Sequence, residues 1–140
     1  AEPVGYRVTD GGKSAAFLTD LGHATPELEA ALRDLDALLL ESNHDVRMLE
    51  AGPYPYSLKR RILGDCGHLS NESAGRLLSL LCHGGLKQVL LGHLSKENNL
   101  PELAYETVRC ELRLTHGKGE AEELPLAVAA RDGCSKLYEF

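Results

Sequence analysis

Three polar residues of this 140-residue sequence come directly after short apolar runs. Asp20 follows residues 13–19, Glu41 follows Ala37 to Leu40, and His93 follows Gln88 to Gly92. Such runs are typical of strands buried on both faces, and α/β proteins bind ligands beyond the carboxyl ends of their strands. A carboxylate can bridge two cations, and a neutral imidazole is a good zinc ligand. Asp20 and His93 are therefore candidate metal ligands.

Each candidate also has an ordinary structural explanation. Asp20 could simply cap the turn that follows it. His93 could be a hydrogen-bonded residue at the end of a strand, with no ligand at all. The residues alone leave both alternatives open.

A further histidine could transfer a proton. His68 lies just before Ser70, which predicts a helix N-terminus, and a carboxylate such as Glu41 could orient the imidazole for general acid–base work. Alternatively, His68 is a loop residue and Ser70 and Asp45 are ordinary N-caps. His44 is ambiguous. The remaining histidines are expected to be surface or packing residues: His23, His83 and His116.

The alternation of apolar runs with amphipathic stretches predicts an α/β architecture in which helices cover a mixed sheet. Strands are expected at 5–8, 13–19, 37–40, 88–92, 126–130 and 136–140, the first two joined by the turn at Asp10-Gly11-Gly12. Helices are expected from Thr25 through Leu35, at 45–51 and 57–63, from Ser70 to Gly84, and from Pro101 to about Leu114, followed by a polar loop at 117–123.

The composition is ordinary for a soluble globular domain, with 43% hydrophobic and 26% charged residues. No apolar run is long enough to span a bilayer. A net charge of -6 argues against non-specific nucleic-acid binding by the whole surface. The stretch Lys59-Arg60-Arg61 could still contact phosphate, or it could be a solvated helix face. The four cysteines form no C-x-x-C pair and are expected to be reduced, mostly buried residues of a cytoplasmic protein.

Six segments, taken in order, resemble the metallo-β-lactamase-fold hydrolases and closely the YycJ/WalJ group. The matching segments are Pro3 to Tyr6, Thr19 to Gly22, Leu40 to Asp45, Lys59 to Leu63, Gly67 to Glu72, and Gly92 to Asn99.

The resemblance implies an αββα sandwich with two divalent metal ions, zinc or manganese, between the edges of its sheets. It implies that Asp20 bridges the two metals and that His93 is a ligand. A weaker similarity to ribonuclease Z implies that Glu41 and His68 form a proton relay to the leaving group. In the polar loop after His93, the candidate substrate contacts are Ser95, Asn98 and Asn99.

One departure from the family is large. The H-x-H-x-D-H motif and a third-motif histidine are absent, so residues 1–140 are expected to be the C-terminal half of the domain, carrying two of seven implied ligands. A catalytic zinc normally takes three protein ligands. We therefore expect an incomplete metal site, an inactive chain, and a partner that is either the missing N-terminal half or a second copy in a homodimer.

The leading hypothesis is that the intact protein is a metal-dependent phosphodiesterase acting on nucleic acid, in which a metal-activated water attacks phosphorus and His68 protonates the leaving oxygen. A hydrolase of a thioester, lactone or lactam is the alternative within the same fold. A non-catalytic assembly module is the alternative outside enzymes.

Overall fold

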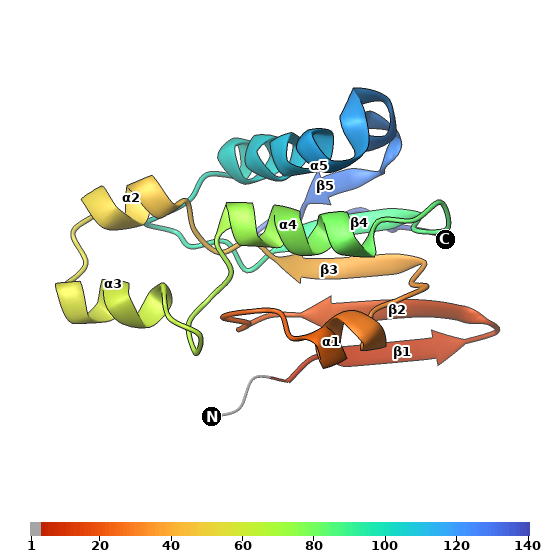
Figure 1. Ribbon diagram of the computed structural model, residues 1–140, viewed down its shortest axis with the longest axis horizontal. Helices are drawn as coiled ribbons and strands as arrows, with labels where there is room; N and C mark the ends of the chain where they lie inside the picture. Colours follow the sequence, from red (N-terminus) through yellow and green to blue (C-terminus); the bar gives the residue numbers. More distant parts are fainter. Residues whose placement is uncertain (1–3) are drawn as a thin grey trace.

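The computed structural model describes residues 4–140, and its centre is one five-stranded sheet (Figure 1). The strands lie side by side in chain order, β1 antiparallel to β2 and the others parallel. Pro3 of the first matching segment lies outside the described residues. No helix among residues 4–140 is long and apolar enough to cross a membrane. The strands are β1 Tyr6–Asp10, β2 Lys13–Leu18, β3 Ala37–Glu41, β4 Gln88–Gly92 and β5 Leu126–Val128.

Side-chain caps fix the start of three of the helices. The side-chain oxygens of Thr25, Asp45 and Ser70 accept hydrogen bonds from backbone N–H groups in the first turns of α1, α2 and α4. Such caps satisfy donors that have no partner inside the helix. The helices are α1 Pro26–Ala31, α2 Val46–Ala51, α3 Tyr56–Ile62, α4 Asn71–Leu81 and α5 Pro101–Glu123.

The hydrophobic core lies between one face of the sheet and the helices α1, α4 and α5, which cover that face (Figure 1). Alternate strand residues such as Leu18, Leu40 and Leu91 are almost completely buried there. Side chains of a strand alternate between faces, so the residues between them point to the other side. In strand register, this second face carries the apolar row Tyr6, Phe17, Leu39, Leu90 and Ala127.

The second face is less well covered than the first. Tyr6 is 66% exposed and Phe17 is 47% exposed, whereas Leu39 and Leu90 are partly exposed. We call this row of five residues the open face. An exposed apolar row of this kind is a surface that drives association.

Four expectations are wrong. The helix expected from Thr25 through Leu35 ends at Ala31, and residues 32–34 form a turn. Residues 118–123 continue α5 after a kink at Gly117, whose backbone is not helical. The Arg109 guanidinium donates to the carbonyls of Ala121 and Leu124 and so ties this segment to the preceding turns of α5. No strand forms at 136–140 in the described chain. The cysteines are free but not mostly buried: Cys66, Cys110 and Cys134 are exposed, and Cys82 is half-buried.

Candidate metal and proton-transfer site

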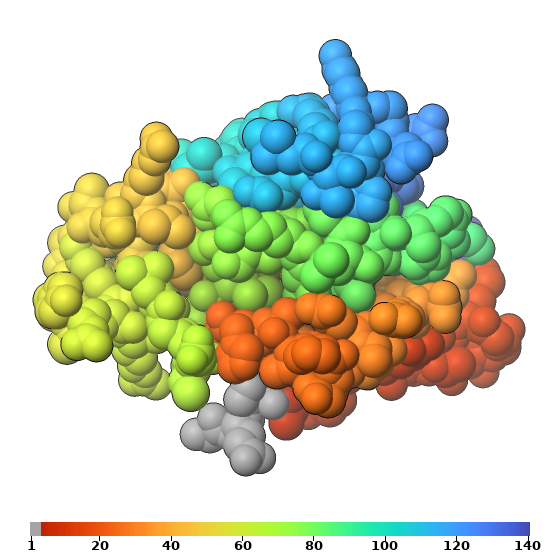
Figure 2. Space-filling view, viewed as in Figure 1, coloured from red at the N-terminus to blue at the C-terminus, as the bar shows by residue number. Residues whose placement is uncertain are grey.

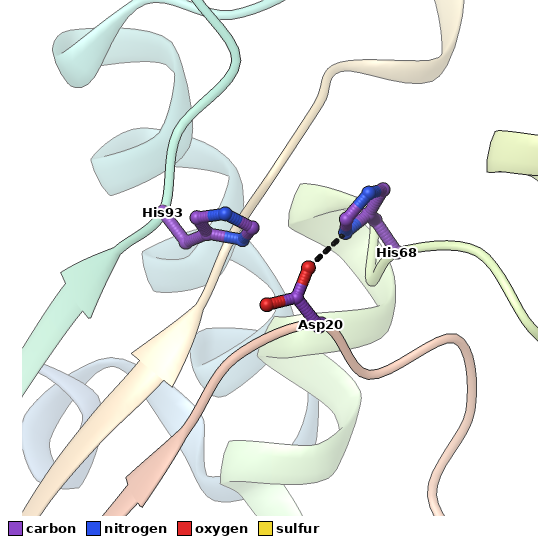
Figure 3. A group of neighbouring side chains, drawn as sticks. All are labelled: Asp20, His68 and His93. Atoms are coloured by element: carbon purple, nitrogen blue, oxygen red, sulfur yellow. Dashed lines mark ion pairs between the residues drawn. The ribbon is translucent and has the colours of Figure 1, made fainter. Parts of the chain in front are cut away.

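The three strand-end residues meet at one edge of the sheet. Asp20 follows β2, Glu41 is the last residue of β3, and His93 is the first residue after β4. Because β2, β3 and β4 are parallel neighbours, their carboxyl ends lie together. His68 arrives from the loop before α4, and its side chain lies with those of Asp20 and His93 (Figure 3).

Asp20 and His93 both have left-handed backbone conformations, with φ of 59° and 56°. This region is uncommon for residues with a side chain, although aspartate, asparagine and histidine enter it more readily than others. The conformation turns the chain sharply where each strand ends. Such strained residues persist where the surrounding structure holds them, which is a frequent property of functional sites.

One buried carboxylate joins the two histidines. Glu41 is completely buried, and its Oε1 lies 2.7 Å from Nδ1 of His68 and 2.8 Å from Nδ1 of His93. Its other oxygen, Oε2, accepts a hydrogen bond of 2.7 Å from the backbone N–H of Leu21. Three donors therefore surround one carboxylate, which offsets the cost of burying its charge.

This arrangement fixes the protonation of the two imidazoles. An ionised carboxylate only accepts hydrogen bonds, so each Nδ1 must carry a proton. The remaining nitrogen of each ring, Nε2, is then a lone-pair donor in the neutral form. A histidine that binds metal usually donates its other ring N–H to a carboxylate in this way. The hydrogen bond to Glu41 also raises the pKa of His93, against the opposing effect of burial.

Asp20 completes a group with metal-binding character. Its Oδ1 lies 3.9 Å from Nδ1 of His68, the contact dashed in Figure 3. Asp20, His68 and His93 each offer one ligand atom, and these atoms lie within 4.8 Å of one another. The Asp20 side chain is 65% exposed, so the group opens to solvent. One carboxylate and two imidazoles suit zinc or manganese, and the donor set therefore fits a divalent metal.

The group opens into a cleft of about 890 Å³. Two cations line it: Arg61 from α3 and Lys96 from the loop after β4. Lys59 does not line it, because its Nζ donates to the backbone carbonyls of Glu50 and Gly52 and so connects α3 to the end of α2. Within the basic stretch at 59–61, Lys59 therefore stabilises the structure, whereas Arg61 faces the cleft.

A buried amide network lies behind the cleft. Asn99 Nδ2 donates to the backbone carbonyls of Ser42 and Asn43, and Asn71 bonds both Asn99 and the Ser42 hydroxyl. Asn43 in turn donates to the carbonyl of His93 at 2.8 Å. The network therefore fixes the backbone that carries Glu41 and His93. Of the three candidate substrate contacts, Ser95 lines the cleft, whereas Asn98 and Asn99 are buried.

Two glycines let the loops of the site approach one another. A Cβ at Gly22 would collide with the backbone carbonyl of Asp65, and a Cβ at Gly67 would collide with that of Ile62. Gly22 lies two residues after Asp20, and Gly67 directly precedes His68. Close backbone contact thus helps to place both side chains.

The structure adds features that sequence reasoning missed. The hydrogen bond between Glu41 and His93 was not expected, although a histidine ligand needs an orienting partner. The amide network of Asn71 and Asn99 left no sequence signal, because its members come from three separate segments.

The chain belongs to the β-lactamase superfamily. The model of the Beta-lactamase superfamily domain matches residues 1–94. A solved structure, the metallo-β-lactamase fold protein YhfI of Bacillus subtilis, is similar with a TM-score of 0.51 at 18% identity, over 88% of this chain and 39% of that one. The fold expected from the sequence, a mixed sheet covered by helices in the metallo-β-lactamase class, is confirmed.

The similarity to the YycJ/WalJ group is also confirmed. The chain is 39% identical over 125 residues to Exodeoxyribonuclease YycJ of Bacillus anthracis, covering 89% of this chain and 47% of the relative. It is 42% identical over 106 residues to Exodeoxyribonuclease WalJ of Streptococcus pneumoniae serotype 2 (strain D39 / NCTC 7466), covering 76% and 39%. The chain spans less than half the length of these relatives.

Proposed function

We propose that this chain is part of a metal-dependent nuclease that hydrolyses phosphodiester bonds of nucleic acid. One observation carries the proposal: Asp20, His68 and His93 meet around the buried Glu41 in a cleft lined by Arg61 and Lys96. Cations beside a metal-binding group suit a phosphodiester, which is anionic before and during hydrolysis. The similar proteins named exodeoxyribonuclease point to the same chemistry.

In this proposal, Asp20 and His93 hold the metal, and Glu41 orients His93. Divalent metals, zinc or manganese, supply Lewis acidity and activate water when bound. Glu41 also orients His68, whose imidazole, when protonated on both nitrogens, would give its Nε2 proton to the leaving oxygen and keep Nδ1–H bonded to Glu41. Arg61 and Lys96 bind the phosphates on either side, and Ser95 is within the same cleft for a hydrogen bond to substrate.

We further propose that the chain alone is inactive. Of the three grouped side chains in residues 4–140, the proposal uses two, Asp20 and His93, as metal ligands. A dinuclear site needs more ligands than this, since even one catalytic zinc normally takes three. In this proposal Asn98 and Asn99 are buried residues that stabilise the loops lining the cleft. They would contact substrate only if the loop after β4 moved.

The open face is the surface against which a partner carrying further metal ligands would pack. We propose that the remainder of the domain, or a second copy of this chain, covers the row from Tyr6 to Ala127, because exposed apolar rows drive association. Light scattering of the isolated chain should show a mass that rises with concentration. A monomer at every concentration would contradict coverage by a second copy.

The substrate class is tested with the longest natural form of the protein that contains this chain. Loaded with zinc or manganese, it should cleave bis-p-nitrophenyl phosphate and DNA. It should leave lactam, lactone and thioester substrates intact, because the Glu41–His68 pair has no evident task in opening a lactam. Turnover of a thioester or lactam with no phosphodiester cleavage would replace this proposal with the alternative hydrolase.

A further inference from the structure

A second cavity, of about 500 Å³, shares His68 with the cleft of the metal-binding group. It lies between α2 and the N-terminal end of α4, which are neighbours in Figure 2, yellow beside green. His44 and Glu72 line it, together with Arg47 and Arg76. Nothing in the proposed chemistry at Asp20 and His93 uses this cavity.

His44 is buried here with both ring nitrogens unused. It is 1% exposed, and neither Nδ1 nor Nε2 has a hydrogen-bond partner among the described residues. Its backbone, in contrast, is firmly held, because its carbonyl accepts from the N–H of Asn71 at 2.9 Å and the residue pairs with Ser70 in a β-bridge. Buried polar groups without partners are rare and call for an explanation, such as a ligand.

The unpaired atoms define what could bind. Burial lowers the pKa of His44 and so favours the neutral ring, which offers one donor and one acceptor. Oε2 of Glu72 is also buried without a partner and adds an anionic acceptor. A phosphate would offer only acceptors to that carboxylate, and a metal ion would leave the His44 N–H unpaired. A ligand whose edge carries an acceptor beside donors would pair with the His44 N–H and with Glu72 Oε2, whereas the other ring nitrogen points away from that edge.

We propose that this cavity binds a nucleobase of the nucleic-acid substrate, with guanine preferred. Guanine places an acceptor, O6, beside the donors N1–H and N2–H, which match a histidine N–H and a carboxylate, and proteins read unstacked bases along this edge. Arg47, which is exposed at the cavity, is available to the adjoining phosphate or to the face of the base. The inference rests on the proposed nuclease function and places a nucleoside beside the cleaved bond.

The test follows the His44 side-chain signals of the 140-residue chain by NMR during titrations with dGMP, dTMP and inorganic phosphate. dGMP should shift these signals and bind at least about tenfold more tightly than phosphate and several-fold more tightly than dTMP. His44→Leu and Glu72→Gln should each weaken dGMP binding by about tenfold. His83→Leu is the matched control, because His83 also has a buried, unpaired Nε2 but lies in the loop after α4.

Three results would overturn the inference. Equal binding of phosphate and dGMP would make the cavity an anion site. If the His44 signals stayed unchanged with every probe, His44 would be a structural residue. If Glu72→Gln bound dGMP as tightly as the unsubstituted chain, the carboxylate would not belong to the site. The Glu72→Gln variant also keeps the test decisive if His44→Leu does not fold. Each of these can occur while the longer protein still cleaves DNA, so this inference and the proposed function fail separately.

Discussion

Replacing Glu41 with glutamine should disable both histidines of the site at once. The glutamine amide keeps one acceptor oxygen but adds a donor, which must face an existing N–H from His68, His93 or Leu21. We expect zinc affinity to fall by about 10- to 100-fold, as for other carboxylates that orient metal-binding histidines. We also expect the free energy of unfolding to fall by about 1–3 kcal/mol, because a buried N–H loses its partner. Competition with a chelator and urea unfolding measure the two effects.

The loss of stability should depend on pH in the metal-free protein. Glu41 raises the pKa of His93, so the protonated ring is favoured in the folded state. That contribution is fully present below the unfolded pKa and disappears as the pH rises through the folded pKa. Glu41→Gln should therefore cost more stability near pH 5.5 than near pH 8.5. Glu97→Gln, an exposed position in the same loop as Ser95, is the control and should change neither stability nor metal affinity. An equal loss at both pH values would contradict the pairing of His93 with Glu41.

Asp20→Asn should remove catalysis without disturbing the fold. The side chain is largely exposed, and asparagine tolerates the left-handed conformation of this position. The neutral amide is a poor ligand for a divalent cation, so we expect kcat for bis-p-nitrophenyl phosphate to fall by about 10³-fold in the longer protein, with Tm unchanged.

The sequence offers a closely matched control for this substitution. Asp34 is also an exposed aspartate with a positive φ, of 58°, but it lies at the other end of the sheet, after α1 and before β3. Asp34→Asn should leave kcat unchanged. If both variants retained full activity, the assignment of Asp20 as a metal ligand would be lost.

Much of the sheet and its carboxyl edge could be predicted from the sequence. The runs before Asp20, Glu41 and His93 are largely apolar, and parallel strands bring such ends together, so these runs alone indicate a strand-end site. The pairing of Glu41 with His68 is one of two alternatives that the residues leave open and is also implied by the resemblance to ribonuclease Z, and the structure shows it at 2.7 Å.

Other features depend on contacts that no local pattern encodes. The second bond of Glu41, to His93, joins residues 52 positions apart and needs the exact register of β3 and β4. Residues 117–123 have the composition of a polar loop, yet Arg109 holds their helix through backbone carbonyls. The unpaired nitrogens of His44 are likewise a property of packing, since the same histidine at a surface would meet water.

The most direct measurement of the central claim is a zinc titration of the 140-residue chain, followed through its histidine side-chain NMR signals. We predict that the signals of His93 and His68 shift first and together, that saturation needs an excess of zinc because the two proposed ligands, Asp20 and His93, bind the ion weakly, and that Asp20→Asn weakens the response. Shifts confined to His23, His83 or His116, or no response of His93 at any zinc concentration, would contradict the claim that Asp20 and His93 hold the metal.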